Sequence, residues 1–327
     1  MATFSILLLC SQSHWSIRDA IQSVLAQSFT DWECLICDDA SKDGTEALVL
    51  EYLGDARFRY HRHPSNVGQG ANWGVAIAKT SAPYIATLHA DDVWLPNAIA
   101  TYWNAFVHHE NCDIVSAGWE RTDSDLRVLA HQPPARRAID CCAHEAVQRI
   151  LLENPILPSA SAFRRSVAES SGLPNVNYGM LCDREYFLRL AAHSRRFVIA
   201  EELIMLYRVH DASVTAKYSR NHRLVSELQD FDCQLADFLR DIPQREQLLM
   251  DYRRQIADFY FRSGLTLFQQ GEVVRAKQII GHALQNDAGL LRDPKRLAKW
   301  ILYRCGPFGR LVLPMIHSRN KYVNELV

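Results

Sequence analysis

No stretch of this 327-residue chain stays apolar over the roughly 20 residues that a membrane-spanning helix requires. The N-terminus also lacks the basic segment and small-residue cleavage site of a secretory signal peptide. The chain passes from Met1-Ala2-Thr3 directly into the apolar run Phe4–Cys10, which predicts a buried first strand. We therefore expect neither a membrane span nor a secretion signal.

The chain has no excess of charge of either sign. Lys and Arg number 36 against 37 Asp and Glu, so the formal net charge is −1. No long-range field then draws nucleic acid or an anionic membrane to the whole surface. This balance argues against a nucleic-acid partner, and any anionic ligand has to be recognised by a local group of residues.

The cysteine spacing of a structural zinc site is missing as well. Cys34 and Cys37 form a C-x-x-C, but Leu35 and Ile36 between them indicate a buried strand, and no second pair follows at zinc spacing. The nine cysteines are an odd number, and several lie in apolar runs. We expect a reduced, cytoplasmic protein. The alternative location is the inner face of the membrane.

Two common phosphate-binding loops are absent. The segment Asn66–Gly74 contains three glycines but follows neither the G-x-G-x-x-G nor the Walker pattern. The segment Cys10–Ile17 has neither glycine nor lysine, which argues against a nucleotidyltransferase that makes activated sugars. Glycines and amides in Asn66–Gly74 can still approach a heterocycle or a sugar closely.

What the first hundred or so residues do contain is an alternation of short apolar runs with segments of helical periodicity. This alternation is typical of a mostly parallel sheet covered by helices, an α/β fold whose ligands bind in the loops after the strands. The strands predicted from the apolar runs are Phe4–Cys10, Trp32–Cys37, Phe58–His61, Tyr84–Leu88 and Asp113–Ala117. A helix is predicted over Leu181–Ala192, and short extended runs over Phe197–Ala200 and Leu203–Val209.

Beyond about Ser219 the strand pattern stops and helical spacing continues almost to the end. We therefore expect one domain over residues 1–218 and a helical C-terminal region over residues 219–327. Ile256–Leu284 resembles a tetratricopeptide-type helix pair, with a plain helical hairpin as the alternative. The segment Lys295–Ile316 interleaves basic and apolar residues, so it either lies on a membrane surface or covers the core.

Two pairs of carboxylates follow predicted strands. Asp38 and Asp39 come after the second strand, and Asp91 and Asp92 come after the fourth. Such carboxylates can accept hydrogen bonds from a base and a ribose, or hold a divalent cation against phosphate oxygens. A polar turn is the alternative for the first pair, and a helix N-cap before Pro96 is the alternative for Asp92.

Five segments, in their order and spacing, resemble the inverting nucleotide-sugar glycosyltransferases of family 2, which have the GT-A fold. The resemblance resumes further along and covers about two-thirds of the chain. The five segments are Gln27–Glu33, Asp38–Thr45, Asn66–Gly68, Ala71–Gly74 and Leu88–Asp92, and the later matches are Asn154–Arg165, Asp183–Leu190 and Tyr207–Val214. The resemblance implies a GT-A sheet flanked by helices, here with a C-terminal helical extension.

The resemblance also implies roles for the matching residues. Asp183 would be the catalytic base that deprotonates the acceptor hydroxyl, and Asp91 and His210 would bind Mg²⁺ or Mn²⁺ at the diphosphate. The implied donor contacts are Cys10, Gln12, Asp38, Asp39, Asn66, Gly68, Asn72, His89, Asp91 and Arg208. A helix N-cap is the alternative for Asp183, and a surface histidine is the alternative for His210.

Two departures from the family pattern stand out. Leu9-Cys10-Ser11-Gln12 replaces the usual proline and polar residues after the first strand, which is expected to alter donor contacts. His89 replaces the first acid of the D-x-D motif, but imidazole can still ligate Mn²⁺ or bond a ribose hydroxyl.

The resemblance therefore implies a metal-dependent inverting glycosyltransferase that uses a nucleoside-diphosphate sugar. Its acceptor would be a glycan or a lipid-linked saccharide in bacterial surface polysaccharide synthesis, with peripheral membrane contact through the C-terminal tail. The alternative, motivated by His89, is a catalytically weakened homologue that binds a nucleotide sugar or a glycan and uses its helical region for interaction.

Overall fold

The structure is a computed structural model that describes residues 2–129, 138–211, 213, 223–240, 242, 244–304 and 306. The chain divides into two compact units, Met1–Asn221 and His222–Val327. The division expected between residues 218 and 219 lies outside the described residues.

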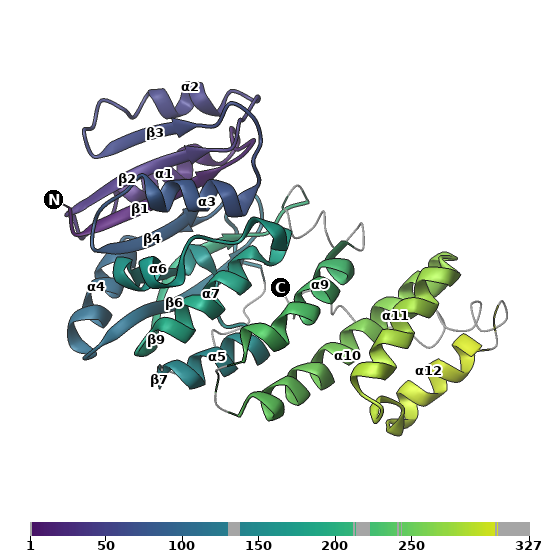
Figure 1. The fold of residues 1–327 in the computed structure, drawn as a ribbon. Coiled ribbons are helices and arrows are strands. Elements are labelled where there is room, and N and C mark those ends of the chain that lie inside the picture. The colour runs from purple at the N-terminus through teal and green to yellow at the C-terminus, as the bar shows by residue number, and fades with distance from the viewer. Residues whose placement is uncertain are drawn as a thin grey trace. The chain divides into compact units, whose positions relative to one another are not determined.

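The first unit is built on one mixed sheet. Within the described residues the sheet has nine strands in the order β3-β2-β1-β4-β8-β6-β9-β5, with β7 paired to β9. Figure 1 shows β3, β2, β1 and β4 side by side in this order, and these four run parallel. The strands are β1 (Phe4–Cys10), β2 (Trp32–Asp38), β3 (Phe58–Arg62), β4 (Tyr84–His89), β5 (Val93–Trp94), β6 (Cys112–Thr122), β7 (Ile139–Cys142), β8 (Ser161–Arg164) and β9 (Arg196–Arg208). The predicted α/β fold with a mostly parallel, mixed sheet is confirmed.

The strand bounds follow the apolar runs closely. β1 begins and ends where the sequence predicts, and β2, β3 and β4 each continue one residue further. The prediction of two separate extended runs, over Phe197–Ala200 and Leu203–Val209, was wrong, because they form the single strand β9. Its pairing with β6 shifts register at Gly118, where an added Cβ would lie 2.8 Å from the carbonyl oxygen of Glu202. The missing side chain lets the two backbones approach closely at this irregularity.

Helices cover the sheet because each has an apolar face. In α1, Ile17, Ile21 and Val24 recur at helical spacing, and all three are fully buried in the core cluster with Phe4. Burying each such side chain contributes about 1.5–3 kcal/mol. The helices of this unit are α1 (Ile17–Leu25), α2 (Thr45–Leu50), α3 (Gln69–Ala78), α4 (Ala98–His108), α5 (Ala143–Leu152), α6 (Arg165–Ser171) and α7 (Cys182–His193).

The register of the parallel strands brings their carboxyl ends to one edge. Cys10 pairs with Asp38 across β1 and β2, and Asp38 pairs with Arg62 of β3. On the other side of β1, Leu9 pairs with His89 at the end of β4. The loops after these strands therefore start next to one another, where ligands of open α/β sheets bind.

The described residues of the second unit form helices and turns, without a strand among them. It contains α9 (Arg223–Phe238), α10 (Arg245–Gln270), α11 (Val273–Asn286) and α12 (Pro294–Arg304), and α10 lies beside α11 (Figure 1). Gly271, with φ of +92°, ends α10 in the left-handed region that glycine adopts at helix C-termini. Residues 307–316 of the basic and apolar tail segment lie outside the described residues. None of the described helices is both long and apolar enough to cross a lipid bilayer.

Candidate active site

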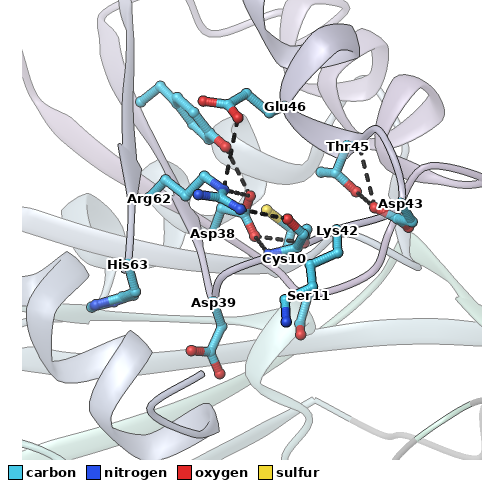
Figure 2. A network of polar contacts seen from close by, with 12 residues as sticks. Cys10, Ser11, Asp38, Asp39, Lys42, Asp43, Thr45, Glu46, Arg62 and His63 are labelled. Atoms are coloured by element: carbon cyan, nitrogen blue, oxygen red, sulfur yellow. Dashed lines mark hydrogen bonds and ion pairs between the residues drawn. The ribbon is translucent and has the colours of Figure 1, made fainter. Parts of the chain in front are cut away.

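Asp38, the last residue of β2, is fully buried and uses both carboxylate oxygens within the protein. Oδ1 accepts hydrogen bonds from the Ser41 amide (3.0 Å) and the Ser41 hydroxyl (2.6 Å). Oδ2 accepts from the Tyr60 hydroxyl (2.8 Å) and lies 3.7 Å from Nε of Arg62. Figure 2 shows Asp38 within this network. Asp38 therefore fixes the shape of the loop after β2.

Asp39 points away from the Asp38 network (Figure 2) and joins two loops. Its Oδ1 accepts from the Val67 amide (2.6 Å), while Oδ2 accepts from the Gly68 amide (2.9 Å) and the Asn66 side-chain amide (2.9 Å). Gly68 has φ of +87°, a value that a residue with a side chain rarely adopts. The loop before α3 is thus held against the end of β2 by a carboxylate that binds N–H donors.

Three residues predicted to bind the donor lie near these loops with different exposure. Asn72 is buried, donates to the Cys37 carbonyl (3.0 Å) and accepts from His63 Nε2 (3.1 Å). Cys10 is also buried, and burial together with the nearby Asp38 carboxylate raises the pKa of its thiol. Gln12 is exposed, and its side-chain oxygen accepts from the Lys42 amide (3.3 Å). Of these three, Gln12 is the one open to solvent.

A histidine and two aspartates meet at the end of β4. One ligand atom each from His89, Asp91 and Asp92 lies within 4.8 Å of the others. Nε2 of His89 is buried and has no hydrogen-bond partner among the described residues. An unpartnered buried nitrogen beside two carboxylates is an arrangement that a divalent metal such as Mn²⁺ can satisfy, since this ion accepts both nitrogen and oxygen ligands. The residues therefore fit a metal ion.

The last part of the site comes from the end of β9 and the segment that follows it. His210 Nε2 donates to Asp91 Oδ2 at 3.1 Å, and the Arg208 amide donates to Asp92 Oδ1 at 3.2 Å. The pairing of β5 with β9 brings the segment after β4 beside the end of β9. His210 is thus part of the Asp91 site rather than a free surface histidine.

The surroundings of Asp91 and Asp92 shift their pKa values in opposite directions. Burial opposes ionisation of Asp91, but the hydrogen bond from His210 and the charges of His89 and His210 lower its pKa. Burial and the adjacent Asp91 carboxylate raise the pKa of Asp92 well above its usual value. Of the two carboxyl groups, the surroundings therefore favour ionisation of Asp91. Asn97, not Asp92, is the N-cap of α4.

Asp183 lies in the first turn of α7, whose N-cap is Leu181 and not Asp183. Burial raises the pKa of its carboxyl, although the Arg184 amide, which donates to Oδ1 at 2.6 Å, and the charge of His89 act in the opposite direction. A Cβ on Gly70 would lie 3.4 Å from Cβ of Cys182, so the start of α3 packs on the start of α7. Asp183 therefore lies in a helix that packs on the start of α3, close enough to His89 for the charge of that residue to act on it.

Arg208 is almost fully buried. Its Nη2 donates to Asp19 of α1 at 2.8 Å, and its guanidinium carbon lies 5.1 Å from the ring centroid of Trp15. The Trp15 ring in turn lies 4.6 Å from the ring of His210, at 67°. Arg208 therefore faces Asp19 and Trp15 rather than solvent.

The sequence reasoning missed some residues of the site. Trp15 and Asp19 were not predicted to contribute, nor was Ser159, whose hydroxyl accepts from the His89 amide at 3.0 Å. Ser159 lies in Asn154–Arg165, which resembles the family, so that match was a usable signal. Trp15 is a large aromatic residue in an otherwise polar loop, Ser11–Ser16, and this contrast was the available signal.

Comparison with known proteins gives concordant matches. The family model described as "Glycosyl transferase family 2" matches residues 10–172. The Escherichia coli protein "UDP-Glc:alpha-D-GlcNAc-diphosphoundecaprenol beta-1,3-glucosyltransferase WfgD" is 34% identical over 205 residues, which cover 59% of this chain and 80% of that protein. "Uncharacterized glycosyltransferase RT0329" of Rickettsia typhi is 24% identical over 276 residues, 81% of this chain and 82% of that protein.

Solved structures agree in fold. Staphylococcus aureus TarS 1–349 in complex with UDP has a TM-score of 0.57 at 15% identity and covers 99% of this chain and 95% of its own. Mannosyltransferase PcManGT of Pyrobaculum calidifontis, in complex with GDP-Man and Mn²⁺, has a TM-score of 0.57 at 15% identity, with 97% of this chain and 88% of its own covered. The predicted GT-A fold is confirmed.

Proposed function

The chain belongs to glycosyl transferase family 2 and is a glycosyltransferase that uses nucleotide sugars, and from this premise we propose a metal-dependent, inverting transfer to a glycan acceptor. Two observations support the proposal most: the cluster of His89, Asp91 and Asp92 at the end of β4, and the contact of His210 with Asp91. The charge of the same His89 also acts to lower the pKa of Asp183, which comes from a distant part of the sequence.

The residues near the donor site fall into two groups: those that would contact the donor, and those that hold the surrounding loops in place. The carboxylate of Asp39 already binds N–H groups, which is the chemistry needed to accept a hydrogen bond from a nucleobase. Asn66 and Gly68 donate to Asp39, and the exposed Gln12 after β1 offers its side-chain amide to the nucleoside. Asp38, Asp39, Asn72 and Cys10 are all buried, so the base contact of Asp39 rests on its match to the family pattern. We assign Asp38, Asn72 and Cys10 to holding these loops in place, because their side chains bond to Ser41 and to the Cys37 carbonyl at the end of β2.

A divalent cation fits the Asp91 site. His89, Asp91 and His210 would hold Mg²⁺ or Mn²⁺, and a cation there offsets the negative charge that develops on the departing nucleoside diphosphate. Asp92 is bonded to the Arg208 amide and supports the loop. We assign Arg208 to the same supporting role, because its guanidinium is buried against Asp19 and Trp15 in the structure.

Asp183 is the proposed catalytic base. The acceptor hydroxyl oxygen forms a bond to the anomeric carbon as the bond from that carbon to the diphosphate oxygen breaks, and the hydroxyl proton passes to the Asp183 carboxylate. A single displacement of this kind inverts the anomeric configuration. A raised pKa makes the carboxylate a stronger base, and a base works best with a pKa near the operating pH.

The name of a relative supports a proposal for the acceptor. The printed name of the Escherichia coli relative specifies a sugar on diphosphoundecaprenol. We extend this to a lipid-linked saccharide here, in bacterial surface polysaccharide synthesis on the cytoplasmic side of the membrane. Leu297 and Ile301 of α12 are exposed, with Lys295 and Lys299 on the same helix, which supports peripheral contact with an anionic membrane surface.

The anomeric configuration of the product tests the proposal. Purified protein is incubated with UDP- and GDP-sugars, Mn²⁺ and lipid-diphosphate-linked monosaccharides, and the product linkage is read by NMR. An α-linked donor should give a β-linked product. A product that keeps the donor configuration contradicts the proposed displacement.

A second function is favoured by His89, which replaces an acid of the family pattern: a homologue that binds nucleotide sugars without turnover. Titration calorimetry with the same donors and Mn²⁺ separates the two. Binding of a donor with no release of nucleoside diphosphate, across all acceptors tried, favours the binding protein.

A further inference from the structure

Trp15 is a large aromatic side chain that the reaction scheme above does not use. It lies in the loop between β1 and α1 and is 45% exposed. The edge-to-face contact with His210, at 4.6 Å and 67°, puts it beside a proposed metal ligand. The Arg208 guanidinium carbon also lies 5.1 Å from its ring centroid.

These contacts form a chain that ends at the metal site. Asp19 of α1 binds Nη2 of Arg208 at 2.8 Å, Arg208 lies at Trp15, Trp15 lies at His210, and His210 donates to Asp91 at 3.1 Å. A guanidinium near an aromatic ring and an edge-to-face pair of rings are both attractive and directional. They restrict the positions that the imidazole can occupy.

Metal-binding histidines depend on such partners. Groups that contact the ligand from outside the coordination sphere fix its ring orientation, and their loss weakens metal binding. The Trp15 ring packs against the His210 ring while Nε2 of His210 faces Asp91. The exposed tryptophan is thus placed to orient a ligand without occupying a coordination position.

We propose that Trp15 is a positioning residue of the metal site, which holds the His210 imidazole toward Asp91 and is itself held by Arg208. The inference rests on the proposed function in one respect, namely that the cation binds at Asp91 and His210. It adds a residue from the β1–α1 loop, far from both ligands in sequence, to the determinants of metal affinity.

Binding of MnCl₂ alone to the full-length protein, followed by the electron paramagnetic resonance of free Mn²⁺, tests the proposal. Trp15→Ala should weaken Mn²⁺ binding about 10-fold, Trp15→Phe should retain most of the affinity, and Trp15→Leu should behave like alanine. Leu25→Ala, which truncates an exposed apolar side chain at the other end of α1, is the matched control and should bind as the wild type does. Thermal unfolding of each variant verifies the fold.

A double-mutant cycle with His210→Ala shows whether Trp15 acts through His210. The loss caused by Trp15→Ala should disappear when His210 is already alanine, whereas a general structural role gives losses that add. Additive losses, or equal affinity of Trp15→Leu and Trp15→Phe, overturn the inference. If wild type binds Mn²⁺ and Trp15→Ala binds it equally well, this inference fails alone, whereas a wild type that binds no Mn²⁺ contradicts the proposed function as well.

Discussion

His210 Nε2 lies 3.1 Å from Oδ2 of Asp91, although the two residues are 119 positions apart in the sequence. The contact joins the segment after β9 to the end of β4. It also helps to keep Asp91 ionised, because the hydrogen bond and the charge of His210 lower the pKa of that carboxyl against the effect of burial. An ionised carboxylate with an adjacent imidazole is the basis for placing the cation here.

Replacement of Asp91 by Asn should remove most of the metal affinity. The amide keeps the shape of the side chain but loses the charge that binds a divalent cation, so we expect nucleoside-diphosphate release to fall at least about 100-fold at a fixed Mn²⁺ concentration. Asp125→Asn, at an exposed position, is the control. Unchanged Mn²⁺ binding in Asp91→Asn, measured by calorimetry, contradicts the assignment.

His89 should set the choice of metal. A nitrogen ligand favours Mn²⁺, whereas Mg²⁺ prefers oxygen ligands, so His89→Asp is expected to reduce the ratio of Mn²⁺ to Mg²⁺ affinity by about 10-fold. The buried, unpartnered Nε2 is the reason for this expectation. Calorimetric titration of both metals into the wild type, His89→Asp and the exposed control His108→Asp measures the ratio. An equal ratio in all three proteins counts against metal binding by His89.

The raised pKa of Asp183 should appear in stability as a function of pH. The folded protein holds the Asp183 proton more tightly than the unfolded chain does, whose ordinary aspartate pKa is about 3.9. This group therefore contributes stability below that pH, and the contribution is lost as pH rises through the raised folded pKa. Urea unfolding of the wild type and Asp183→Asn over a pH series should show the variant gaining relative stability as pH rises. A difference that does not change with pH contradicts burial of this carboxyl.

Two glycines of the second unit should respond in opposite ways to replacement by alanine. An added Cβ at Gly264 of α10 would lie 2.5 Å from Cγ1 of Ile280 and 3.3 Å from the carbonyl oxygen of Ala276, whereas one at Gly281 of α11 meets nothing within 4 Å. We expect Gly264→Ala to destabilise this unit by about 1–3 kcal/mol. Gly281→Ala should instead stabilise it by up to about 1 kcal/mol through helix propensity. Hydrogen exchange of peptides from residues 245–286 measures both, and equal effects would contradict the close packing of α10 on α11.

The sheet was largely predictable from the sequence because β1 to β4 are buried apolar runs between turn residues. β9 was harder to predict, since its exposed middle residues, Glu201 and Glu202, interrupt the apolar pattern at the point where the pairing shifts at Gly118. The two-residue strand β5 is too short to leave a periodic pattern. Pairing with β9 is what defines it.

The position of the candidate carboxylates at the strand ends could be predicted from the sequence, but the partners that each carboxylate bonds could not. Asp38 and Asp39 are adjacent in sequence, yet one is bonded to Ser41 and Tyr60 and the other to the loop before α3. Backbone geometry decides this, and Ala40 has φ of +57° immediately after them. The contact of Trp15 with Arg208 depends on tertiary packing, which no local pattern encodes.

Release of nucleoside diphosphate by the wild type and Asp183→Asn, measured side by side with and without Mn²⁺, tests the central claim most directly. The wild type should release it with a donor and an acceptor present, lose activity on chelation and regain it with added Mn²⁺. Asp183→Asn should bind the donor normally and be slower by about 10²–10⁴-fold, the usual contribution of a positioned base. Full activity in Asp183→Asn, or wild-type transfer that persists without a divalent cation, would contradict the account.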